Sequence, residues 1–102
     1  MAATVHIDHV VRDYETWKPM FDAFDNFLAE AGARNCRVQR FTHYPNRVLV
    51  DVDFDSMAAA EAFRERLREI AGQPRSQEML VTHEVSILEL VDEHHPKLTA
   101  SS

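Results

Sequence analysis

Four side chains that exchange protons occur as two pairs in the sequence. His6 and Asp8 form one pair, and Asp51 and Asp53 form the other. Within each pair the residues are two positions apart, the spacing that puts both side chains on one face of a β-strand. If a partner excluded water from a face carrying three carboxylates and an imidazole, at least one carboxylate pKa would rise, as is typical of general acids and bases. We therefore predict these four residues as catalytic.

The same four residues also have a purely structural interpretation. Arg37 and Arg47 lie in neighbouring extended segments. Carboxylates that pair with these arginines across a sheet, or that lie at a wet mouth of the site, contribute to stability and solubility rather than to chemistry.

Alternation of apolar and polar residues predicts four strands. We expect them at residues 4–11, 35–44, 47–54 and 79–91. Pro45-Asn46, two turn formers between the second and third runs, predicts a hairpin.

The first helix is predicted from apolar residues that recur every three or four positions between Trp17 and Ala31. Gly32 is the expected C-terminal stop. Because Pro19 fits best in a first turn, where its missing N–H has no intrahelical partner, we place the N-cap at Thr16.

The second helix is predicted over residues 57–70, capped by Asp55-Ser56 and ended by Gly72. A polar connector leads from it to the last strand. Residues 92–102 form a polar tail without periodicity, so we predict one domain over residues 1–91.

Two strand–helix–strand units joined by a hairpin predict a ferredoxin-like α+β fold. Right-handed crossovers put both helices on one face of an antiparallel sheet with strand order 4-1-3-2. The opposite face keeps apolar side chains beside its polar groups, and these are Val10, Phe41, Leu49, Leu88 and Leu90. Leaving them in water forfeits about 1.5–3 kcal/mol each relative to full burial, so a second copy of the chain is the expected cover.

Several stretches of the sequence resemble one known superfamily. They read His9-x-Val11-x-Asp13-Tyr14-x-x-Trp17-Lys18-Pro19-x-Phe21-Asp22, Pro45-Asn46-x-Val48 and Phe54-Asp55-Ser56, and together they span about half of the chain. On these residues the chain resembles the dimeric α/β-barrel superfamily, in particular the small bacterial proteins grouped with antibiotic biosynthesis monooxygenases and often called cyclases.

The resemblance implies a homodimer whose sheets face one another and enclose, in each protomer, a pocket for a small aromatic, polyketide-like or otherwise apolar compound. Members of the superfamily include oxygenases without flavin or metal, haem-degrading enzymes, dismutases, isomerases and cyclases. The segment after Leu67 departs from the short relatives by a longer connector and an extra tail. No catalytic motif is shared by all members, so no mechanism transfers residue by residue.

A pocket of this kind has seven candidate substrate-binding residues. They are His9, Val10, Trp17, Phe41, His43, Tyr44 and Leu49. Four of them also have a plainer interpretation: His9, on an apolar strand face, fits a hydrogen-bonded core histidine, Trp17 fits a helix core, and a loop His and Tyr such as His43 and Tyr44 are frequent without function. We predict no cofactor and no metal site, because the adjacent His94-His95 pair in the tail lacks the spacing of metal ligands.

Composition excludes several other classes of function. The 17 acidic and 11 basic residues give a net charge of −6, which disfavours nucleic acid as a partner. A single cysteine, Cys36, allows no internal disulfide, and no apolar run reaches the length of a membrane span or a signal sequence, so a cytoplasmic protein without a membrane partner is expected. Phosphate-binding loops, dinucleotide fingerprints and nucleophile elbows are absent from the sequence.

The predicted function is a homodimeric barrel that binds a small, largely apolar organic molecule, with cofactor-independent monooxygenation, cyclisation or isomerisation as the candidate reactions. Two alternatives stay open: a binding or sensing module without catalysis, and an assembly domain whose interior is filled by side chains.

Overall fold

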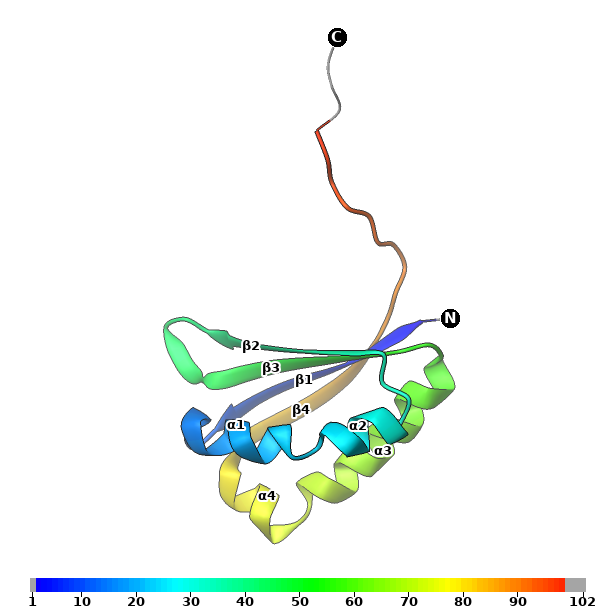
Figure 1. Ribbon diagram of the computed structural model, residues 1–102. Coiled ribbons are helices and arrows are strands. Elements are labelled where there is room, and N and C mark those ends of the chain that lie inside the picture. The colour runs from blue at the N-terminus through cyan, green and yellow to red at the C-terminus, as the bar shows by residue number, and fades with distance from the viewer. Residues whose placement is uncertain (1, 99–102) are drawn as a thin grey trace.

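The computed structural model describes residues 2–98. The elements in chain order are β1 (Ala3–Val11), α1 (Tyr14–Asp22), α2 (Asp25–Glu30), β2 (Asn35–Phe41), β3 (Tyr44–Phe54), α3 (Met57–Ala71), α4 (Pro74–Met79) and β4 (Leu80–Glu89). The strands form one antiparallel sheet in the order β2-β3-β1-β4, and the helices cover one face of it (Figure 1). This order is the predicted 4-1-3-2 arrangement read from the other edge, so the ferredoxin-like α+β fold is confirmed.

The core lies between the sheet and the helices because β1 and β3 alternate strictly. Along β1, and along β3 from Val48 onward, every second side chain is buried beneath the helices, and the intervening ones face the opposite side. From α3, Ala60 and Phe63 are buried against this layer, and the Phe63 and Phe54 ring centroids lie 5.1 Å apart. The fully buried aliphatic residues of the two strands are Val5, Val11, Val48, Val50 and Val52.

The start of α1 differs from the prediction. Asp13, not Thr16, is the N-cap: its carboxylate accepts hydrogen bonds from the Thr16 backbone N–H at 3.1 Å and from the Thr16 hydroxyl at 2.6 Å. The helix therefore begins at Tyr14, and Pro19 lies inside it. A proline there cannot donate to the carbonyl four residues earlier, which weakens the helix that follows.

The helical segment is also interrupted rather than continuous to Ala31. It ends at Asp22 and resumes as α2 at Asp25. At the break the Phe24 N–H donates to the carbonyl of Phe21, only three residues back, at 2.9 Å. The apolar spacing that predicted one helix therefore runs through two helices.

The hairpin turn lies three residues earlier than predicted. Thr42 and His43 form the turn, and the Pro45-Asn46 pair lies inside β3, where the register with β2 is irregular. Asn46 contacts the first helix instead, because its side-chain oxygen accepts from the Tyr14 N–H at 2.9 Å and its amide donates to the Arg12 carbonyl at 3.3 Å. Asn46 thus braces the junction between β1 and α1.

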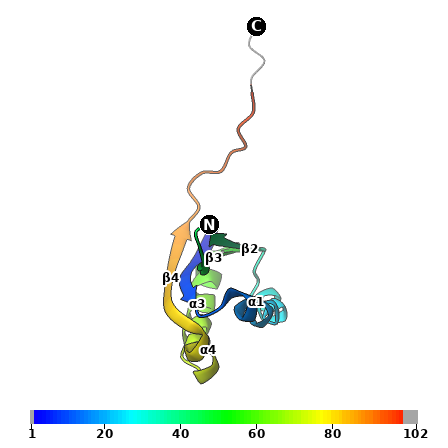
Figure 2. The ribbon, with the colours of Figure 1, turned by 90° about the vertical axis from the view of Figure 1, so that its left-hand side faces the viewer.

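The connector before the last strand contains α4, which was not predicted. Pro74 occupies its first turn, a position that suits a residue without N–H. Residues 90–98 have no helix or strand and extend away from the sheet (Figure 2). The predicted tail, 92–102, thus lies only partly within the described residues, because residues 99–102 are outside them. No helix among residues 2–98 is both long and apolar enough to cross a membrane.

Candidate functional site

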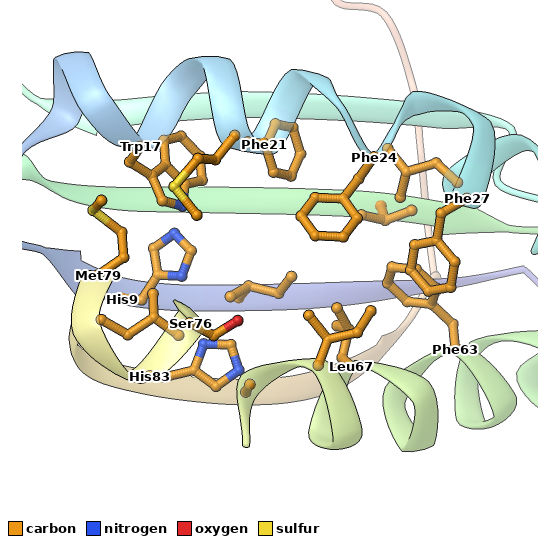
Figure 3. Close-up of a pocket in the computed structure, with 17 residues that line it drawn as sticks. His9, Trp17, Phe21, Phe24, Phe27, Phe63, Leu67, Ser76, Met79 and His83 are labelled. Carbon is orange, nitrogen blue, oxygen red and sulfur yellow. The ribbon is translucent and has the colours of Figure 1, made fainter. Parts of the chain in front are cut away.

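A cavity of about 90 Å³ lies between the sheet and the helix layer (Figure 3). One water needs roughly 10–15 Å³, so the cavity has room for a group of several heavy atoms. Its walls come from all four helices and from β1, β3 and β4. They are apolar except for His9, Ser76 and His83. Apolar walls with a few convergent polar groups are typical of small-molecule sites.

His9 is the most deeply buried polar group of this cavity. Strand alternation turns it toward the helices with Ile7 and Val11, and only 5% of the residue is exposed. Neither ring nitrogen has a hydrogen-bond partner within residues 2–98. An unpaired buried polar group costs about 1–3 kcal/mol, so this side chain is held at the expense of stability.

Two aromatic side chains flank His9. The edge of the His9 ring meets Trp17, with centroids 5.2 Å apart and planes at 79°. On the other side, the His83 ring lies with its centroid 5.7 Å from that of His9. The positions follow from local structure, because His9 and His83 are direct partners in the β1–β4 register and the Asp13 cap fixes where Trp17 falls on α1.

Both histidines are neutral at pH 7. Burial first, and then the nearby His83, lower the pKa of His9 to about 4, although the charge of Asp8 acts in the opposite direction. Burial also lowers the pKa of His83, whose two ring nitrogens likewise have no partner among the described residues. Each neutral ring offers one N–H donor and one lone pair to a ligand in the cavity.

The four predicted catalytic residues lie on the opposite face of the sheet. His6 is the register partner of Asp51, and the His6 Nδ1 to Asp51 Oδ1 distance is 2.6 Å. Asp53 accepts a hydrogen bond from the Thr4 hydroxyl at 2.6 Å. Asp8 accepts two hydrogen bonds from Arg47, at 3.2 and 2.8 Å. The sequence therefore predicted their common face, and their catalytic role stays a prediction.

The arginines named in the structural interpretation are both present beside these acids. Arg47 holds Asp8, and Arg37 lies 3.7 Å from Asp51. The hydrogen bond from Arg47 is the main reason that the pKa of Asp8 falls below its ordinary value, opposed by partial burial. For Asp8 this direction is the reverse of the rise that crowding of like charges predicted.

Two of the seven predicted substrate-binding residues, His9 and Trp17, line the cavity. Val10 and Leu49 belong to the outer sheet face, since their neighbours in sequence, His9 and Val48, point inward. The remaining three lie at or beside the exposed hairpin turn and outside the cavity lining, and they are Phe41, His43 and Tyr44.

No other residue of the lining was predicted to bind substrate, and His83, Ser76 and Met79 are among those missed. His83 alternates with Val85 and Ile87 on the inward face of β4, a signal that could have identified it. Ser76 and Met79 come from α4, whose short polar sequence gives no amphipathic pattern. Within residues 2–98, no group of three or more His, Cys, Asp or Glu side chains is arranged to hold a metal ion.

No protein-family model matches the chain, and no curated protein matches it by sequence. Solved structures do match. A protein from Bordetella bronchiseptica, provisionally assigned as an antibiotic biosynthesis monooxygenase, is 14% identical with a TM-score of 0.69, over 88% of this chain and 97% of that one. The cofactor-independent oxygenase SnoaB from Streptomyces nogalater is 16% identical with a TM-score of 0.68, over 90% and 95%.

A dimeric ferredoxin-like protein from an uncultured marine organism is 11% identical with a TM-score of 0.67, over 94% of this chain and 93% of that one. At such identities the likeness concerns the fold alone. It confirms the predicted resemblance at that level: the chain has the ferredoxin-like fold of the dimeric α/β barrels, and its structural neighbours include proteins of the antibiotic biosynthesis monooxygenase type.

Proposed function

We propose that this protein is a homodimer in which each protomer binds a small, largely apolar organic molecule in the cavity beneath α1 and α3. The observation that carries this proposal is His9, a buried imidazole without a hydrogen-bond partner among the described residues, in an otherwise apolar cavity. A ligand hydroxyl or carbonyl that meets this ring would satisfy it. The cavity supports a binding role over an assembly domain filled by side chains.

The chemistry that suits this site is proton transfer at His9. A neutral imidazole takes a proton from an acidic O–H or C–H of the bound molecule through its lone pair. The pKa of about 4 makes the ring a weak base in the empty cavity. The transfer leaves an imidazolium beside the newly formed oxyanion, and the attraction between these opposite charges stabilises the state after transfer.

A deprotonated, electron-rich substrate is the common starting point for oxygenation, cyclisation or isomerisation without a cofactor. The fold of SnoaB, described as a cofactor-independent oxygenase, supports this class of reaction. The outer-face acids form a second candidate for acid–base work, favoured by the close His6–Asp51 contact on a face that a partner would cover.

Deuterium exchange tests the catalytic proposal. The probe 4-phenylbutan-2-one has an apolar ring and exchangeable hydrogens next to a carbonyl. In D2O the protein should accelerate this exchange, and His9→Gln should remove the acceleration while Asp51→Asn keeps it. Loss in Asp51→Asn alone would transfer the role to the outer face.

Binding is measured separately on the single tryptophan, Trp17, whose indole N–H gives one NMR signal. The probe should shift this signal because Trp17 lines the cavity. A shift without accelerated exchange would leave a binding module, and no shift at millimolar probe would refute the cavity as a ligand site.

A further inference from the structure

A second, more open pocket adjoins the cavity at the corner where α3, α4 and β4 meet. It measures about 370 Å³, and its lining shares Ala71, Leu80 and His83 with that of the inner cavity. We call the pair the inner chamber and the vestibule. Figure 3 shows His83 on the β4 side of the inner chamber, near Ser76 of α4. His83 is therefore the titratable residue common to both linings.

The two compartments differ in chemistry. The inner chamber is apolar around its two histidines and Ser76. The vestibule lining combines apolar residues with Arg68, Gln77 and His83, and no acidic residue is among its described lining residues. This absence contrasts with the chain as a whole, which carries a net charge of −6.

Hydrogen-bond donors in the vestibule remain free for a ligand. Arg68 uses one guanidinium nitrogen on Glu65 at 3.2 Å, and its other N–H groups have no partner in the described structure. Gln77 uses its amide on the Ala71 carbonyl, which leaves a second amide N–H.

A cation with several free donors recognises an anionic oxygen group, a carboxylate above all, because guanidinium N–H groups bind carboxylates by charge-assisted hydrogen bonds. The exposed Arg68–Glu65 pair is no strong competitor, since exposed ion pairs of this kind contribute little. Glu65 and Arg68 are three residues apart on α3. The Arg68 side chain can therefore turn from Glu65 to a ligand carboxylate without any change in the backbone.

We propose that the natural ligand is an amphipathic organic acid, with an apolar ring or chain in the inner chamber beside His9 and a carboxylate at Arg68 in the vestibule. This inference rests on the proposed function and names the class of molecule that the site selects. The ligand would enter the inner chamber with its apolar end first and keep its carboxylate in the vestibule. His83 lies where the apolar and polar parts of the ligand meet.

A matched pair of probes tests this inference. 3-(4-Hydroxyphenyl)propanoate and 4-propylphenol have the same ring and tail length but differ in the terminal carboxylate. Binding is followed by the Trp17 indole signal in titrations of the wild type, Arg68→Gln and Arg66→Gln. Arg66→Gln is a suitable control because it removes the same charge from the same helix. Arg66 packs over Phe27 and is not among the residues that line the vestibule.

Arg68→Gln should weaken binding of the acid by about three- to tenfold and change binding of the alkylphenol by less than twofold, whereas Arg66→Gln should affect the two probes equally. Added salt should weaken the binding of the acid to the wild type more than the binding of the alkylphenol. If the alkylphenol binds but Arg68→Gln leaves the affinity for the acid unchanged, the inference is overturned and the proposed function stands. If neither probe shifts Trp17, both are overturned.

Discussion

His9 and His83 face each other across β1 and β4 with ring centroids 5.7 Å apart, and none of their four nitrogens has a hydrogen-bond partner among residues 2–98. Two neutral imidazoles in an apolar cavity make the fold sensitive to acid. If either ring took up a proton, the charge would lie in the cavity without a nearby compensating group on its walls.

The pH dependence of stability has a definite sign. An unfolded histidine has a pKa of about 6.5, whereas the pKa of His9 in the folded protein is about 4. Between these pH values the unfolded chain binds more protons than the folded protein. The contribution of His9 to the free energy of unfolding is therefore complete above pH 6.5 and falls by up to about 3 kcal/mol as the pH falls toward 4. Urea denaturation at several pH values measures this loss.

His9→Phe should remove most of that dependence and leave the protein at least as stable as the wild type at pH 7, because an unsatisfied polar ring is replaced by an apolar one. His43→Gln changes an exposed histidine and is the control. An unchanged pH slope in His9→Phe would show that His9 is not the source of the acid sensitivity.

Asp8→Asn tests the structural interpretation of the outer-face acids. Because Asp8 holds Arg47 by two hydrogen bonds, its replacement should destabilise the protein by about 1 kcal/mol, a small effect because both side chains are partly exposed. Asp22→Asn, which breaks an exposed pair with Lys18, should cost less. A more stable Asp8→Asn variant would instead support the predicted cluster of repelling, catalytic acids.

Core packing predicts different costs for removing a phenylalanine from α3 and from the segment that joins α1 and α2. Phe63→Ala should cost about 3–5 kcal/mol, because its ring is buried against Phe54 and Phe27. Phe24→Ala should cost clearly less, because Phe24 lies at the break between α1 and α2 and is only half-buried beside the cavity. Glu65→Ala is the surface control. Equal midpoints of urea denaturation for the two Phe variants would contradict this packing.

Assembly is expected through the outer sheet face. Sedimentation at micromolar concentration should give a mass near twice 11.8 kDa. Leu49→Lys, in the middle of that face, should shift the protein toward the monomer, because a charge buried against the partner is costly. Glu65→Lys, on the exposed surface of α3, should not. A wild type that stays monomeric would refute the proposed homodimer.

Strand alternation made the fold predictable from the sequence. The inward and outward residues of β1, and of β3 from Val48 onward, follow a period of two, so the shared face of His6, Asp8, Asp51 and Asp53 follows from it. The predictions that were wrong concern local hydrogen bonds. Asp13, and not Thr16, caps α1, and Asn46 accepts a hydrogen bond from the Tyr14 N–H instead of forming the turn.

The location of the cavity was less predictable. The resemblance implied a pocket enclosed by facing sheets, whereas the cavity of this chain lies on the helix side, beside His9 and Trp17. Its position depends on how far the interrupted helices stand from the sheet, which no apolar spacing reveals. Ser76 and Met79 reach it from α4, an element without a sequence signal of its own.

Asp8 and His9 are consecutive residues of β1, and they serve opposite sides of the sheet. The negative charge of Asp8 nevertheless raises the pKa of His9. The basicity of the cavity is therefore partly set from the far side of a single strand, where Arg47 pairs with Asp8. A subunit that docks on that side and shifts this ion pair would change the pKa of His9. Docking and the proton affinity of His9 are then thermodynamically linked, and each changes the other by the same free energy.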